Sequence, residues 1–303
     1  MVFKNDYSIG VVTYVNRYHT YFKKNILSLL KYFPDKQIIV VINGHPDKLK
    51  QFSYLKKITQ WLASLKIQYI TFEDHQALSK CWNLILLMSQ VEKILLLNDD
   101  ILIKNNFRKD FENKLKEEKP FFTINSSFSH FLISKDVIRK IGWFDERFLG
   151  IGQEDGDYLY RIILGNIDKE DYVCSDIINF IAPATDSSFQ NISKMIGKYA
   201  SVNEIFMKKK WTIDNYSTET NNQNKKFLWF DYNCKIKIND NMETPNFYDL
   251  SLLDNYEYFA PKNKKLKDSY MGVYKHIRNF FKKNKGFYYF YQFLKAFNNR
   301  KNK

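Results

Sequence analysis

In the N-terminal third of the chain, short runs of apolar residues alternate with longer amphipathic segments. The short runs suit buried strands and lie at 8–15, 37–44, 67–72 and 93–101. The amphipathic segments suit helices and lie at 21–33, 49–65 and 77–90. Pro34 is expected to end the first helix, because proline cannot continue one. Strands that alternate with helices predict an α/β fold with a mostly parallel sheet flanked by helices.

The fourth predicted strand ends in three polar residues, Asn98, Asp99 and Asp100. Open α/β sheets bind ligands beyond the carboxyl ends of their strands, so these side chains are expected at a binding site. Carboxylate oxygens there suit Mg²⁺ or Mn²⁺ on a diphosphate, because phosphates and water supply the remaining ligands. The alternative is a strand that ends in an ordinary turn, which Asn and Asp favour.

A second acidic cluster follows two glycines at 150 and 152. Glu154, Asp155 and Asp157 stand at the predicted start of a helix. Three acids beside a flexible loop suit a site where a carboxylate meets a substrate hydroxyl. The alternative is structural, because acids at a helix start cap free amides and complement the helix dipole.

The whole string at 141–162, IGWFDERFLGIGQEDGDYLYRI, closely resembles the acceptor-side motif of inverting, family-two-like glycosyltransferases of the GT-A fold. The resemblance covers roughly residues 6–212. It implies that Asp155 is the general base that takes the proton of the acceptor hydroxyl, and that Glu154 orients acceptor or donor hydroxyls. It also implies that 98–100 is the DxD position, with Asp100 as the first metal ligand and Asp99 as the second. Asn98, in the first place of the motif, would hydrogen-bond a ribose hydroxyl.

Four more positions match this family residue by residue. Thr13 and Tyr14, in TYVNR, resemble the segment that passes the nucleotide after the first strand. Asn43 falls where the family contacts the base, and Asn83, in ALSKCWN, falls on the helix near the pyrophosphate. Each also has an ordinary interpretation, as a strand residue, a turn former or a solvent-facing helix residue.

After residue 162, fewer positions of the chain match the family pattern. Many relatives have a metal-binding histidine some twenty residues past the Glu-Asp pair, and here 179–189 occupies that place, with Asn179 and Asp186 as further ligand candidates. The segment 203–211 resembles the ending of bacterial relatives, where a basic residue such as Lys210 would meet the diphosphate. The alternative there is a solvated charge run.

Composition excludes several classes. Cys81, Cys174 and Cys234 show no paired spacing, which argues against a disulfide framework or a Cys-based zinc site. GxxxxGK[ST] and GxGxxG strings are missing, which argues against a P-loop kinase or a Rossmann oxidoreductase. The sequence has neither an apolar leader nor a run of about 20 apolar residues, so a cytoplasmic protein is expected.

The positive charge is concentrated at the C-terminus. Residues 261–303 hold thirteen Lys and Arg against one acid, Asp268, which leaves +2 of the net charge of +14 for the rest. This concentration argues against a nucleic-acid-binding enzyme surface. With its many aromatic residues, the segment suits helices at the inner face of an anionic membrane or, equally, a helix pair packed on the domain or on a second subunit. The predicted organisation is a catalytic domain at 1–213, a linker at 214–260 and this helical tail.

The resemblance therefore implies a metal-dependent, inverting glycosyltransferase with a UDP- or GDP-linked donor and a glycan or lipid-linked acceptor. A bacterial surface polysaccharide, such as capsule or lipooligosaccharide, is the expected product from the resemblance. Two alternatives remain open, a nucleotidyltransferase of sugar activation and a non-catalytic glycan-assembly protein. A nucleotidyltransferase is expected to have a glycine-rich phosphate loop after the first strand, and TYVNRYHTYF has no glycine.

Overall fold

The computed structural model describes residues 6–14, 17–44, 48–72, 74–179, 187–214 and 235–254. The chain forms two compact units, residues 1–250 and residues 251–303, and the first contains the sheet described below. Of the predicted linker at 214–260, residues 215–234 and 255–260 lie outside the described residues, as does the whole predicted tail at 261–303.

A seven-stranded sheet runs through the first unit in the order β3-β2-β1-β4-β7-β6-β8. β1 pairs in parallel with β2 and β4, β2 with β3, and β6 with β8, whereas β7 runs antiparallel between β4 and β6. The strands are β1 (Tyr7–Tyr14), β2 (Ile38–Asn43), β3 (Gln68–Thr71), β4 (Lys93–Asn98), β6 (Phe121–Ile124), β7 (Ser127–Ser134) and β8 (Lys169–Tyr172). The predicted α/β class with a mostly parallel sheet is confirmed.

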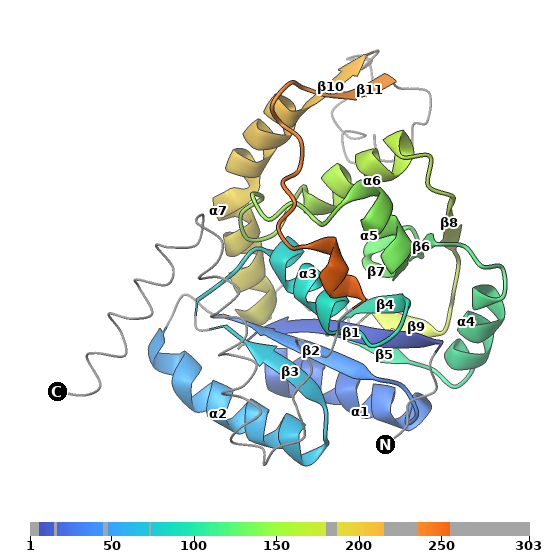
Figure 1. Cartoon of the computed structure of the whole chain (residues 1–303). Coiled ribbons are helices and arrows are strands. Elements are labelled where there is room, and N and C mark those ends of the chain that lie inside the picture. Colours follow the sequence, from blue (N-terminus) through green and yellow to red (C-terminus); the bar gives the residue numbers. More distant parts are fainter. Residues whose placement is uncertain are drawn as a thin grey trace. The chain divides into compact units, whose positions relative to one another are not determined.

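Helices flank this sheet (Figure 1). They are η2 (Tyr18–Phe22), α1 (Lys23–Tyr32), α2 (Lys48–Ser64), α3 (Leu78–Met88), α4 (Phe107–Leu115), α5 (Lys135–Ile141), α6 (Glu154–Leu164) and α7 (Ser187–Lys210). A further short helix, η4, spans Leu250–Leu253. Two small sheets add β5 (Ile101–Ile103) with β9 (Ile177–Asn179), and β10 (Trp211–Asp214) with β11 (Lys235–Ile238). Every strand and helix predicted for the N-terminal third is present within a few residues, and α1 ends before Pro34 as expected.

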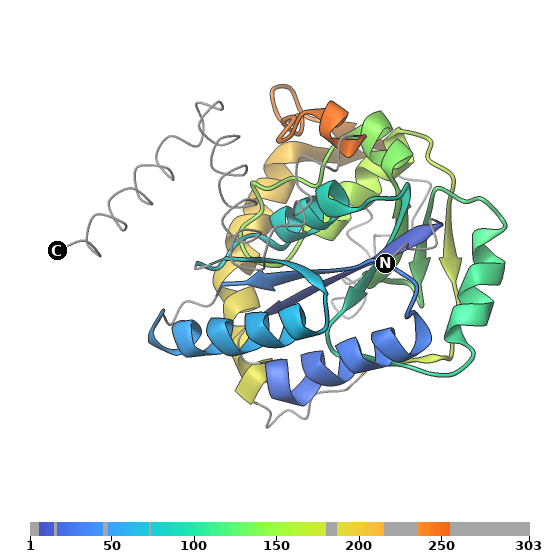
Figure 2. The same ribbon diagram turned by 60° about the horizontal axis from the view of Figure 1, so that its bottom comes forward.

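The two faces of the sheet are packed differently. α1 and α2 cover one face and α3 covers the other (Figures 1 and 2). Tyr7, Ile9 and Val11 alternate along β1 and belong to the core on the α1 and α2 side. Gly10 faces α3, where an added Cβ would lie 2.3 Å from the Ile85 side chain. The glycine therefore lets α3 approach the centre of the sheet closely.

Among the helices of the described residues, none is both long and apolar enough to cross a bilayer.

Candidate active site at the carboxyl edge of the sheet

Three parallel strands bring the N-terminal candidates to one edge. Tyr14 pairs with Asn43 across β1 and β2, and Val12 pairs with Asn98 across β1 and β4. Thr13 is buried, and its Oγ1 donates a hydrogen bond of 2.6 Å to Oδ2 of Asp99. The predicted nucleotide side chains therefore share the carboxyl ends of neighbouring strands, where α/β sheets bind ligands.

Arg17 bridges the two acids that follow β4. Its Nη1 lies 2.9 Å from Oδ1 of Asp99, and its Nη2 pairs with Oδ2 of Asp100. The guanidinium also lies 5.7 Å from the ring centre of Tyr14 and 5.2 Å from that of Tyr21. Sequence reasoning gave this arginine no role, although it belongs to the TYVNR string that was singled out.

Burial sets the protonation behaviour of this cluster. Asp99 is only 1% exposed, and burial raises its pKa to about 6, although the charge of Arg17 lowers it. Burial alone would lower the pKa of Arg17, but the charges of Asp99 and Asp100 raise it above its usual value. Arg17 therefore stays charged at every physiological pH and offsets one of the two carboxylates.

The acidic pair as it stands does not fit a divalent metal ion. Both oxygens of Asp99 and one oxygen of Asp100 are already occupied by Arg17 or Thr13. Within the described ranges, no group of three or more His, Cys, Asp or Glu side chains could hold a metal. The candidate ligand Asp186 and the side chain of Asn179 lie outside the described part. The metal-binding role of Asp100 and Asp99 stays a prediction.

The second acidic cluster opens α6, as predicted from the sequence. Gly150 and Gly152 have φ of 59° and 122°, and a Cβ at Gly150 would lie 2.4 Å from the ring of Tyr199. Both positions therefore require glycine. The N–H of Gly152 donates a 2.5 Å hydrogen bond to Oε2 of Glu154, and that of Gly156 donates one of 2.9 Å to Oδ1 of Asp155.

The two adjacent acids have different environments. Glu154 is 3% exposed, and burial together with the charge of Asp155 raises its pKa to about 8. Asp155 is partly exposed, and desolvation raises its pKa to about 6, against hydrogen bonds from the backbone. At neutral pH Glu154 then holds its proton while Asp155 is mostly ionised. A carboxylate with a pKa just below the working pH suits a general base.

Backbone contacts tie the loop before α6 to the edge that carries the first cluster. The side chain of Asn43 exchanges two hydrogen bonds with the backbone of Gln76, of 3.1 and 2.9 Å. Two residues later, the N–H of Leu78 at the start of α3 donates a 2.8 Å hydrogen bond to the carbonyl of Gly150. The end of β2 and the loop before α6 therefore both contact the segment that begins α3.

Asn83 is fully buried, so its interpretation as a solvent-facing helix residue is wrong. Its side-chain N–H groups donate a hydrogen bond of 2.9 Å to the carbonyl of Phe144 and one of 3.0 Å to Oε1 of Glu146. Its side-chain oxygen accepts a hydrogen bond of 3.0 Å from the N–H of Phe144. The side chain therefore holds the loop that leads to α6. Its contact with a pyrophosphate stays a prediction.

Lys210 is also buried, so the solvated-charge interpretation is wrong for this residue. Its Nζ lies 2.7 Å from Oδ2 of Asp145 and 2.5 Å from Oδ1 of Asp157. Asp157 additionally accepts hydrogen bonds from Arg161 and from the indole of Trp211. This network occupies Asp157 completely, which leaves Asp155 as the partly exposed acid of the cluster.

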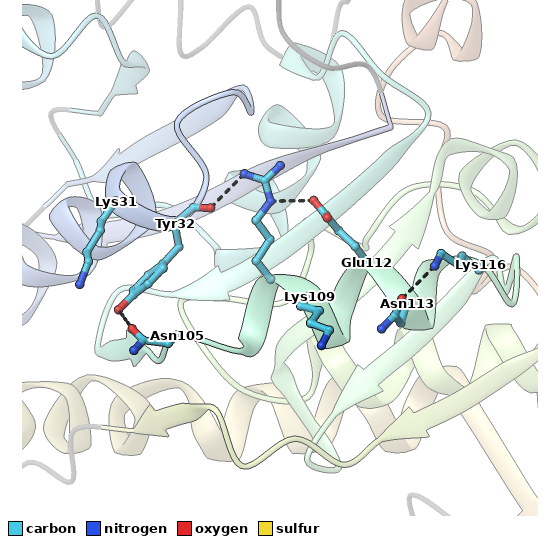
Figure 3. Close-up of a pocket in the computed structure, with 8 residues that line it drawn as sticks. Lys31, Tyr32, Asn105, Lys109, Glu112, Asn113 and Lys116 are labelled. Atoms are coloured by element: carbon cyan, nitrogen blue, oxygen red, sulfur yellow. Dashed lines mark hydrogen bonds and ion pairs between the residues drawn. The ribbon is translucent and has the colours of Figure 1, made fainter.

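A separate hollow of about 420 Å³ lies between the end of α1 and α4 (Figure 3). It is lined by Lys31, Tyr32, Asn105, Arg108, Lys109, Glu112, Asn113 and Lys116. Arg108 is paired there with Asp35 and Glu112. The end of α1 leads into the start of β2, so this hollow lies at the amino edge of the strands, away from the candidate active site.

No protein-family model and no curated protein matches the chain. Among solved structures, S. aureus TarS 1-349 in complex with UDP is similar with a TM-score of 0.43 and 14% identity, over 63% of this chain and 65% of that chain. S. aureus TarS 1-349 in complex with UDP-GlcNAc is similar with a TM-score of 0.42 and 16% identity, over 56% of this chain and 56% of that chain. The chain thus spans less than two thirds of these structures. Function has to be argued from the site itself.

Proposed function

We propose that the protein is an inverting glycosyltransferase that uses a nucleotide diphosphate sugar. The observation that carries the proposal is the acidic pair in the first turn of α6, where Glu154 is 3% exposed and Asp155 is partly exposed, and where burial raises the pKa of both carboxyls. Adjacent acids whose pKa values are raised by burial are typical of acid–base sites. The loop before them is hydrogen-bonded to the start of α3, the helix that follows β3, through the N–H of Leu78 and the carbonyl of Gly150.

In the proposed reaction, the carboxylate of Asp155 takes the proton of the acceptor hydroxyl as its oxygen attacks the anomeric carbon. The bond between that carbon and the diphosphate oxygen breaks, and the nucleoside diphosphate leaves with the electron pair. Attack opposite the leaving group inverts the anomeric configuration. Protonated Glu154 orients a hydroxyl of acceptor or donor by a hydrogen bond, since it keeps its proton at neutral pH.

Donor binding is assigned to the strand ends. Thr13, Tyr14 and Asn43 would line the nucleotide, with Asn83, Asn98 and Asp99 toward the ribose and diphosphate. The resemblance implies Mn²⁺ or Mg²⁺ at Asp100 and Asp99, but the contacts of Arg17 with both acids disfavour a metal ion there in the protein without donor. No step above depends on a metal. The acceptor would be a hydroxyl of a glycan or of a lipid-linked glycan.

Incubation with UDP- and GDP-sugars, with and without Mn²⁺ and with excess chelator, tests the proposal. The expected product in the absence of acceptor is slow release of free sugar and nucleoside diphosphate, which Asp155→Asn abolishes. Release of nucleoside monophosphate or pyrophosphate would indicate nucleotidyl transfer instead. A folded protein that binds no nucleotide sugar under any condition would favour the non-catalytic alternative.

A further inference from the structure

Arg17 has the position and charge that a bound cation would have between Asp99 and Asp100. Its two terminal nitrogens each pair with a different carboxylate, at 2.9 Å for Asp99 and by a close contact for Asp100. The arginine is 9% exposed and Asp99 is 1% exposed, so water screens the Asp99 pair only weakly. Charge pairs of this kind are stronger than pairs on an open surface.

Both oxygens of Asp99 are already engaged by donors of the chain. Oδ1 faces Arg17, and Oδ2 accepts the short hydrogen bond from Thr13. A divalent ion shared by both acids would meet the positive charge of Arg17 at contact distance. Among the described residues, no third carboxylate, imidazole or thiolate completes a group that could hold such an ion.

Two aromatic rings hold the guanidinium where it is. Tyr14 and Tyr21 lie within cation–π distance, at 5.7 and 5.2 Å. Displacing Arg17 would remove it from both rings and both carboxylates. Its buried Nε has no hydrogen-bond partner among the described residues, so the side chain is held by its terminal nitrogens and by these rings.

We propose that Arg17 is the built-in counter-charge of the Asp99–Asp100 pair and keeps free divalent cations off it. The protein without donor then binds Mn²⁺ only weakly, and loss of the arginine opens a divalent-cation site. The inference rests on the contacts of these residues and not on the proposed glycosyl transfer, so the two can fail separately.

The first test uses the wild-type chain and MnCl₂ alone, with free Mn²⁺ measured by electron paramagnetic resonance. We expect no saturable site with a Kd below about 100 μM, a weak affinity for a protein carboxylate site. Asp99→Asn and Asp100→Asn should leave the titration unchanged, because neither acid is a ligand of the free protein. A tight wild-type site that Asp100→Asn removes would overturn the proposal.

The second test replaces the arginine. Arg17→Gln should tighten Mn²⁺ binding about tenfold or more, because it removes a positive charge at contact distance from both acids. Arg17→Lys keeps that charge and should not tighten it. The matched control is Arg139→Gln, since Arg139 bridges Glu92 at 2.8 Å and Asp136 at 2.7 Å on the surface, where no gain is expected.

An unchanged Mn²⁺ affinity in folded Arg17→Gln would contradict the proposal. So would an equal gain in Arg139→Gln, because the effect would then be one of net charge. If Arg17→Gln does not fold, the wild-type, Asp99→Asn and Asp100→Asn titrations still decide the question.

Discussion

The ammonium group of Lys210 lies 2.5 Å from the carboxylate of Asp157, and both side chains are fully buried. Lys210 is the last residue of α7 and Asp157 is in the first turn of α6. The pair therefore ties the end of α7 to the turn that carries Asp155. Burial lowers the pKa of Lys210, which the charges of Asp157 and Asp145 oppose.

Removing the ammonium group of Lys210 should lower the free energy of unfolding. Lys210→Met leaves Asp145 and Asp157 buried without their shared cation, and loss of one partner of a buried ion pair typically costs about 3–5 kcal/mol. We expect a loss of that size in the free energy of unfolding, measured with urea. Lys208→Met is the control, because Lys208 pairs with Glu204 on an exposed face and should cost less than about 1 kcal/mol. Equal losses of unfolding free energy in the two variants would mean that the buried network stabilises the fold no more than a surface ion pair does.

The role of Asp155 can be separated from that of a helix cap. Asp155→Asn should lower kcat by about 10² to 10⁴ with donor affinity nearly unchanged, because general-base assistance has that magnitude. The control is Asp110→Asn, which changes a comparably exposed acid in the first turn of α4. Asp110→Asn should lower the free energy of unfolding by at most about 1 kcal/mol and leave kcat unchanged. A stable and fully active Asp155→Asn enzyme would leave the residue with a structural role only.

The pH profile should reflect both acids of the pair. A base must be deprotonated, so kcat/KM should rise with pH through about 6, the pKa of Asp155. If protonated Glu154 orients a hydroxyl, the rate should fall again above about 8. Adjacent acids titrate as a coupled pair, so the two limbs belong to the pair. Glu154→Gln should remove the alkaline limb, and a profile that is flat between pH 5 and 7 would be incompatible with Asp155 as the base.

Glu154 should also make the stability of the folded protein depend on pH. The folded-state pKa of Glu154, about 8, lies above its usual value of 4.5, so the native state binds the proton more tightly than the unfolded chain. The stability this gives is fully present below pH 4.5 and is lost as pH rises toward 8. Glu154→Gln, which cannot ionise, should therefore raise the melting temperature little at pH 5 and most above pH 8. A constant difference across that range would mean that Glu154 is ionised in the folded protein.

The strands and helices of the N-terminal third could be predicted because their patterns are local. The edge that joins Thr13, Asn43 and Asp99 could also be predicted, since the carboxyl ends of parallel strands meet there. The contact of Arg17 with Asp99 could not, because 81 residues separate them and no pattern links them. Lys210 belongs to a run of three lysines, of which only this one turns inward to two acids. Such pairings depend on tertiary packing, which composition does not encode.

The last prediction concerns residues 261–303, which lie outside the described residues. Each Lys or Arg near an anionic bilayer adds about 1 kcal/mol, so thirteen of them should bring the full-length protein to vesicles of anionic lipid and release it at high salt. Deleting 262–303 should abolish this binding and leave donor hydrolysis largely intact. Neutral vesicles, which lack the attracting charge, are the control in the same co-sedimentation assay.

If the segment instead packs on the domain or on a second subunit, the full-length protein will bind neither kind of vesicle. The truncated form will then be insoluble or will change its oligomeric state on size exclusion.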